Sequence, residues 1–186
     1  VLRQWHGCMG NPCGSPPPVN NWDLTLNATV STYYDTLSYM GVDPLATDGY
    51  DPTFDMPEPP FPPSNFVALY FPHPEWGSPF GANFNSDIRA PIPPGTSKTW
   101  NFEVQTNVGS STVTVSWPFY ARQTPDSLRF TLIDVDGGNT EYNMAQISTF
   151  TYNTGGGGIH HFQVRVGYPA PDISVTPTSS EVTLVQ

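Results

Sequence analysis

Apolar and polar residues alternate in one unbroken run near the start of the chain, over residues 22–30. A period of two places the apolar side chains on one face of a β-strand and the polar side chains on the other. The apolar members are Trp22, Leu24, Leu26, Ala28 and Val30. The pattern therefore predicts a half-buried strand over these residues.

The second half of the chain repeats short patterns of the same kind. Turn-forming sequences rich in Gly, Asn and Asp separate them. The predicted strands cover residues 100–105, 113–117, 128–132, 142–147, 150–152 and 162–166. Strands spaced by about 8–12 residues with turns between them are typical of a β-sandwich. We therefore predict an all-β fold, an immunoglobulin-like β-sandwich with long proline-rich structured loops and extended terminal arms.

Breaks in the pattern divide the chain into four parts. Residues 66–71 are continuously apolar, which indicates a strand buried on both faces or at a sheet junction. Trp117 is the expected core tryptophan of the second half. We predict one elongated unit with two sub-parts. The parts are an N-terminal arm (1–21), a first β sub-part with an acidic proline-rich loop (22–95), an immunoglobulin-like β sub-part (96–168) and a tail strand (169–186).

Acidic residues and prolines interleave over residues 41–63. Proline fixes φ and removes a backbone donor, so this stretch is not expected to form a helix or a central strand. Tyr50, Phe54, Met56 and Phe61 supply packing groups that flexible linkers lack. We therefore predict a long, rigid, structured loop.

The carboxylates of this loop are candidate calcium ligands. Calcium takes about 6–8 oxygen ligands in flexible geometry. The spacing matches no EF-hand, however, and Asp side chains commonly cap turns through the backbone. Calcium is thus the candidate cofactor, with turn capping as the preferred interpretation. The candidate ligands are Asp43, Asp48, Asp51, Asp55 and Glu58.

Residues 134–139 also begin like a calcium loop. Ala145 stands where the bidentate Glu of such a loop is required, so a hairpin turn is the better interpretation. His160 and His161 are adjacent, and in a strand they point to opposite faces. We expect them to be ordinary strand residues rather than joint ligands of one metal.

Motifs for catalysis are missing from the sequence. It contains no Gly-x-Ser-x-Gly elbow, no His-Glu-x-x-His motif and no phosphate-binding glycine loop. Paired carboxylates of a glycosidase would be invisible at this level, because their separation is set by the fold. We expect a protein that is not an enzyme.

Cys8 and Cys13 are the only cysteines of the chain. A local disulfide between them is the simplest interpretation, and it would indicate an oxidising, extracellular setting. A zinc site with His6 and a further histidine, or two free thiols, remain as alternatives.

Charge and hydropathy exclude two classes of partner. The net charge is −10, with one lysine and five arginines, whereas nucleic-acid binding needs clustered basic residues. No apolar run approaches the ~20 residues of a membrane span. The chain opens on Val1, which suggests a processed, secreted form.

One N-glycosylation sequon is present, at Asn27-Ala-Thr29. The alternation of the predicted strand places Asn27 on its polar face. Asn27 is therefore the candidate glycosylation site.

Several residue strings resemble a module of large secreted bacterial surface proteins, a poorly characterised family. They are Gly41-Val-Asp, Ala46-Thr-Asp-Gly-Tyr-Asp-Pro, Asp55-Met-Pro-Glu-Pro-Pro, Tyr70-Phe-Pro-His-Pro-Glu-Trp76 and Ser86-Asp-Ile-Arg89. Residues 113–134 resemble the fibronectin-like half that follows in that module. The resemblance covers most of residues 22–168 and implies secretion, a β-sandwich and a location outside the cell or on its surface. This chain shows no sorting tail or catalytic partner domain, which suggests that the module acts alone.

The last residues of the sequence form another alternating pattern. Val182 and Leu184 flank Thr183 and predict a strand after a proline-rich joint. Such a strand can dock on a neighbouring molecule. Our leading hypothesis is a non-catalytic extracellular subunit that self-assembles into a surface filament or layer, a homopolymer, through intersubunit β-strand contacts.

The alternative hypothesis is a secreted carbohydrate-binding or adhesion module. Exposed aromatic rings would stack on glycans, whereas core packing is the competing interpretation of each ring. The candidate rings are Trp5, Tyr33, Tyr34, Tyr39 and Trp76.

Overall fold

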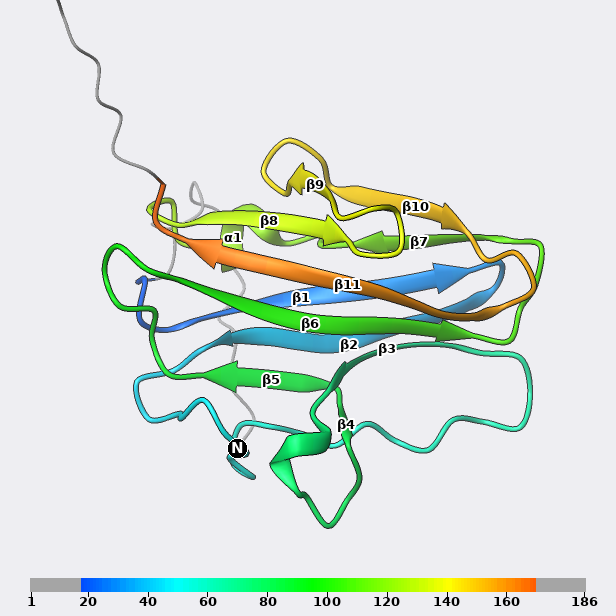
Figure 1. Cartoon of the computed structure of the whole chain (residues 1–186), viewed down its shortest axis with the longest axis horizontal. Helices are drawn as coiled ribbons and strands as arrows, with labels where there is room; N and C mark the ends of the chain where they lie inside the picture. The colour runs from blue at the N-terminus through cyan, green and yellow to red at the C-terminus, as the bar shows by residue number, and fades with distance from the viewer. Residues whose placement is uncertain (1–17, 170–186) are drawn as a thin grey trace, which may run out of the picture.

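The computed structural model of the protein describes residues 18–169, and its strands form two sheets packed across one core (Figure 1). The five-stranded sheet has the order β10 (Thr149–Asn153), β7 (Thr112–Ser116), β1 (Trp22–Val30), β2 (Tyr33–Val42), β5 (Ser86–Arg89). The six-stranded sheet has the order β4 (Asn83–Phe84), β3 (Val67–Pro72), β6 (Ser97–Thr106), β11 (Gly158–Gly167), β8 (Arg129–Asp134), β9 (Thr140–Asn143). The predicted all-β sandwich is thus confirmed.

Nearly all neighbouring strands run antiparallel, and the exception is the pair β2 and β5. Each sheet combines strands from residues 22–95 with strands from residues 96–168, so the two stretches share one core. Two short helices complete the described structure, η1 (Pro74–Trp76) and α1 (Tyr120–Gln123). No helix within residues 18–169 is long and apolar enough to cross a membrane.

A cluster of aromatic rings joins the two sheets. The Trp22 ring of β1 lies 5.8 Å from the Trp100 ring of β6 and 4.9 Å from the Phe130 ring of β8, measured between centroids. The Trp22–Phe130 pair meets edge to face, an arrangement that aromatic quadrupoles favour. The alternating apolar face of β1 therefore packs directly on the opposite sheet.

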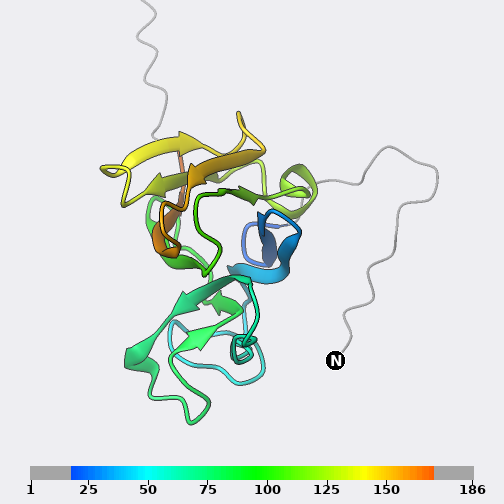
Figure 2. The same cartoon turned by 90° about the vertical axis from the view of Figure 1, so that its right-hand side faces the viewer.

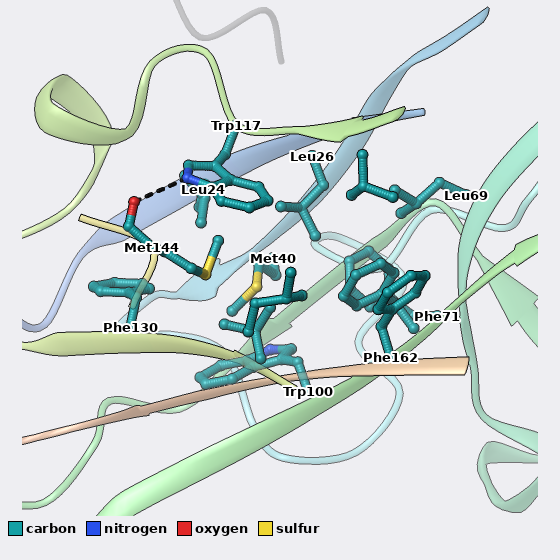
Figure 3. Packing of buried hydrophobic residues seen from close by; sticks show 14 of the residues in the cluster. Leu24, Leu26, Met40, Leu69, Phe71, Trp100, Trp117, Phe130, Met144 and Phe162 are labelled. Atoms are coloured by element: carbon teal, nitrogen blue, oxygen red, sulfur yellow. Dashed lines mark hydrogen bonds between the residues drawn. The ribbon is translucent and has the colours of Figure 1, made fainter. Parts of the chain in front are cut away.

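Trp117 is buried in this core, as the sequence predicts. Its indole Nε1 donates to the backbone oxygens of Met144, at 3.0 Å, and Ile147, at 2.9 Å. Figure 3 shows the first of these bonds among the packed side chains between the sheets. The bonds fix the segment after β9 against the five-stranded sheet.

The strand β1 and the doubly buried β3 lie where the sequence predicts them, while β2 is not anticipated by the pattern. The register between β1 and β2 shifts between Leu26 and Ala28, so that two residues of β2, Thr36 and Leu37, lie opposite Asn27. A bulge of this kind moves the following side chains to the other face. The alternation of β2 is therefore broken in mid-strand.

The acidic loop after β2 is attached to β4 and β5 by backbone hydrogen bonds. Glu58 N donates to Asn83 O at 2.9 Å, and Asn85 N donates to Met56 O at 2.8 Å. An isolated bridge joins Pro57 to Phe84. Figure 2 shows the chain between β2 and β6 gathered on one side of the sandwich, below the β1–β2 hairpin. Residues 43–63 thus form the ordered loop that their composition predicts.

Candidate functional site

The edge of the five-stranded sheet is open along the first half of β2. The strand β5 pairs only with residues 39–42 of β2, from Tyr39 opposite Ser86 to Val42 opposite Arg89. No strand of the described chain lies beside residues 33–38 on that side. An unpaired strand edge is a template for another strand.

A hollow of about 520 Å³ lies beside this open edge. Three segments line it, residues 32–37, 58–62 and 65–68, together with Asn85. We call this hollow the edge groove. It brings the start of β2 against the proline-rich end of the acidic loop and the start of β3, which are separated in the sequence.

The walls of the edge groove are largely apolar. Tyr34 and Leu37 of β2 are 73% and 62% exposed, which is unusual for large apolar side chains. On the opposite wall, the Phe61 and Phe66 rings stack with centroids 5.0 Å apart. Phe61 also lies 5.7 Å from the Tyr70 ring. These contacts hold the proline-rich wall in place.

Two carboxyl groups lie in the groove, Asp35 and Glu58. Asp35 accepts hydrogen bonds from the backbone N–H groups of Leu69, at 2.8 Å, and Leu37, at 3.4 Å. Burial raises the pKa of Asp35, although these bonds oppose the shift. Burial, followed by the charge of Asp35, raises the pKa of Glu58 to about 8. Glu58 is therefore mostly protonated at neutral pH.

The bulge and the β1–β2 turn shape the β2 wall. Ser31, in the two-residue turn, has a positive φ of 53°. At the bulge, the Asn27 side-chain amide lies 3.2 Å from the carbonyl oxygens of both Leu26 and Thr36, and it can donate to both when its nitrogen faces them. Asn27 is half-buried.

The apolar surface continues beyond the groove. A second hollow of about 320 Å³ lies on the other side of residues 58–61, next to residues 80–83. Phe80 in its lining is 69% exposed.

The proposed calcium ligands are mostly engaged with the backbone. Asp43 Oδ1 accepts from Leu45 N at 2.9 Å. Asp55 accepts from Asp51 N at 2.7 Å and from Ile88 N at 3.0 Å. Asp55 thereby connects the acidic loop to β5.

The remaining loop carboxylates point to other partners. Asp51 accepts from Thr47 N, Asp48 pairs with the only lysine, Lys98, and Glu58 lies in the edge groove. Across residues 18–169, the structure brings no three His, Cys, Asp or Glu side chains together in a way that could hold a metal ion. The loop geometry therefore gives calcium no support, and three of the five carboxylates cap turns or fix the loop backbone.

A buried ion network sits where β5 begins. The Asp87 carboxylate accepts from His73 Nε2 at 2.9 Å and from Arg89 Nε and Nη2 at 2.8 and 2.6 Å. The other His73 nitrogen lies 2.7 Å from Glu75, and its ring stacks 3.6 Å from the Trp76 ring. We call these five residues the β5 clamp.

The charges within the β5 clamp support one another. Burial disfavours the ionised form of Asp87, but His73 and Arg89 outweigh it and hold the pKa of Asp87 below its ordinary value. Burial likewise opposes protonation of His73, yet Asp87 and Glu75 raise the pKa of that imidazole. The clamp fixes β5, and with it the point at which the β2 edge opens.

The sequence signal for the clamp is present but indirect. His73, Glu75 and Trp76 lie in one of the strings that carry the family resemblance, and Asp87 and Arg89 lie in another. Nothing in either string shows that the two meet. Only the fold brings them together.

The two adjacent histidines contact the β8–β9 turn. His160 Nε2 lies 2.7 Å from Asp134 Oδ1, and His161 Nδ1 lies 3.0 Å from Asp136 Oδ2. Gly137 N donates to Asp134 at 2.9 Å, and β8 pairs with β9. Residues 134–139 thus form the predicted hairpin turn.

The candidate sugar-binding rings are in different environments. Tyr33 and Tyr34 line the edge groove, Tyr39 lines a separate hollow on the same sheet, and Trp76 is half-buried in the clamp. The other expected site residues lie outside residues 18–169, namely Trp5, His6, Cys8, Cys13, Val182 and Leu184.

Comparisons with protein-family models, curated proteins and solved structures found no match for this chain. The resemblance to surface-protein modules therefore stays a prediction.

Proposed function

We propose that this protein is a non-catalytic extracellular structural subunit, which assembles by adding a β-strand from a neighbouring molecule to the open edge of β2. The observation that carries the proposal is the unpaired edge at residues 33–38 beside the edge groove. Strand addition would satisfy backbone groups of β2, and the groove would receive alternate side chains of the incoming strand.

The chemistry of the groove supports a peptide strand as its occupant. Apolar walls from Tyr34, Leu37 and Phe61 suit apolar side chains, and Glu58 adds no charge when protonated. A strand in this position would lie in line with β5, on the same side of β2.

A non-catalytic role fits the state of the groove carboxyl groups. Each Asp35 oxygen accepts a backbone hydrogen bond, which ties it to the β2 bulge and to β3. The acidic composition and the family resemblance support placing the protein outside the cell, in a filament or surface layer formed by one kind of subunit.

Assembly can be tested by blocking the groove with charge. The double variant Tyr34→Lys/Leu37→Lys should fold normally, because both side chains are exposed, and should remain monomeric by light scattering and electron microscopy. The control Leu45→Lys/Phe119→Lys adds the same charge at exposed positions outside the groove and should assemble like the wild type. Undiminished assembly of the groove variant would refute the proposal.

A carbohydrate-binding function is the second candidate, favoured by the aromatic lining of the edge groove. Tyr33, Tyr34, Phe61 and Phe66 all line it, and Asp35 offers an acceptor for a sugar hydroxyl. A glycan array with the wild type and Tyr34→Ala would decide this case. The second candidate would be favoured if the wild type binds a glycan and stays monomeric, and if Tyr34→Ala abolishes that binding.

A further inference from the structure

We infer that the strand entering the edge groove is the segment 181–186 of a second copy of this chain. The inference rests on the proposed function and adds the identity of the partner. It commits to one segment of one molecule, so it can fail while strand addition itself holds.

The segment has the alternating pattern of a strand that can add to the open edge. Residues 33–38 of β2 pair with β1 on one side and have no described strand on the other, and residues 181–186 read Glu-Val-Thr-Leu-Val-Gln. In an added strand, Val182 and Leu184 point to one face and Thr183 and Val185 to the other. One face would then meet Phe61 and Phe66 on the far wall of the groove.

Charge also favours this segment. Glu181 is its only charged side chain, and it lies at the end of the strand. With Glu58 protonated, Asp35 is the other acidic side chain in the groove lining, and two backbone N–H groups already donate to it. A neutral apolar strand can therefore enter the groove without an unpaired buried charge.

The path of the chain places the start of the connection at the end of the sandwich far from the groove. The last strand, β11, ends at Gly167 opposite Ser97, at the start of β6, whereas Val67 beside the groove lies opposite Thr106 at its end. Figure 1 shows these ends at opposite sides of the sandwich. Ten residues of β6 span about 30 Å.

Residues 168–180 connect β11 to the segment. Thirteen residues reach at most about 45 Å when fully extended, so the connection is long enough to reach the molecule's own groove as well; the second copy follows from the proposed function, and docking within one molecule is an outcome of the test. The same reach carries the segment easily to a neighbour placed end to end. A contact between one end of a molecule and the other end of the next is heterologous and produces open chains.

The test combines two defective proteins. The first lacks residues 181–186 and keeps its groove; the second is Tyr34→Lys/Leu37→Lys and keeps its segment. We expect each alone to be monomeric and a mixture to form heterodimers that grow no further, as seen by light scattering. A synthetic peptide of residues 180–186 should bind the truncated protein, and a peptide with Val182→Asp and Leu184→Asp should bind at least about tenfold more weakly.

Each other outcome overturns a defined part of the argument. If truncation leaves assembly intact while the groove variant abolishes it, another segment occupies the groove and the present inference fails alone. If the groove variant still assembles, the proposed function fails as well. The full-length protein could also stay monomeric and fail to bind the peptide. That result would show that the segment occupies the groove of its own molecule.

Discussion

Glu58 holds its proton to an unusually high pH because it is buried in the edge groove near Asp35. Its pKa in the folded protein is about 8, against 4.5 for an ordinary glutamate. Between pH 4.5 and about pH 8, the folded protein therefore keeps a proton on Glu58 that the unfolded chain has released. By linkage, this group lowers stability progressively as the pH rises from about 4.5 to about 8.

Replacing Glu58 with glutamine should remove this loss. We expect Glu58→Gln to match the wild type near pH 4 and to be more stable by about 1–2 kcal/mol at pH 8, a figure reduced for the partial exposure of the group to solvent. Urea denaturation at the two pH values measures it. Equal stability at pH 8 would show that the group ionises normally.

The β5 clamp makes a second prediction at the scale of single residues. The Asp87 side chain is fully buried between His73 and Arg89, so Asp87→Asn leaves two donors without their charge partner. We expect a loss of about 3–5 kcal/mol in the free energy of unfolding. Glu141→Gln is the matched control, because its pair with Arg165 is exposed, and it should cost about 0–1 kcal/mol. Similar losses for both variants would contradict a structural role for the clamp.

The pairing of β1 with β2 depends on the absence of a side chain at Gly41. A Cβ added there would overlap the backbone oxygen of Trp22 and lie 2.9 Å from Asp23 Cα. The two strands would have to separate, so we expect Gly41→Ala to destabilise the protein by at least about 2 kcal/mol in thermal or urea denaturation. Gly49→Ala, with only Thr47 Oγ1 near, should change stability by less than about 1 kcal/mol.

Elements with unbroken patterns were predictable, and β2 was not. The strand β1 keeps its alternation for its full length, and β3 is apolar throughout. In β2 the bulge at Thr36 and Leu37 reverses the faces in mid-strand, and Gly41 leaves one position without a side chain. β9 ends at Asn143, short of the predicted 142–147, because the chain turns there toward Trp117.

The edge groove could not be predicted for a different reason. It depends on where β5 stops pairing with β2, and β5 is held by contacts between residues 73–76 and residues 87–89, which lie apart in the sequence. The turn-capping role of the acidic loop could be predicted, because the preference of Asp for such positions is local. The raised pKa of Glu58 follows from burial, which only the fold determines.

For the whole molecule, the groove predicts that assembly depends on pH. An incoming strand covers Glu58 and further disfavours its charged form, so the association constant should be level from about pH 6 to 7 and fall above the pKa of about 8. Sedimentation or light scattering across this range measures the effect. In Glu58→Gln the fall above pH 8 should disappear, and an unchanged profile would place the dependence elsewhere.

The mixing of early and late strands in both sheets has a consequence for how the chain acquires its structure. β1 pairs with β7, and β3 pairs with β6, so neither sheet closes before the second half of the chain is available. Contacts between residues so far apart in sequence make folding slow, on the order of milliseconds to seconds. During synthesis the first strands would wait with their apolar faces and edges uncovered, and a chaperone that shields unpaired edges would therefore speed the recovery of soluble protein.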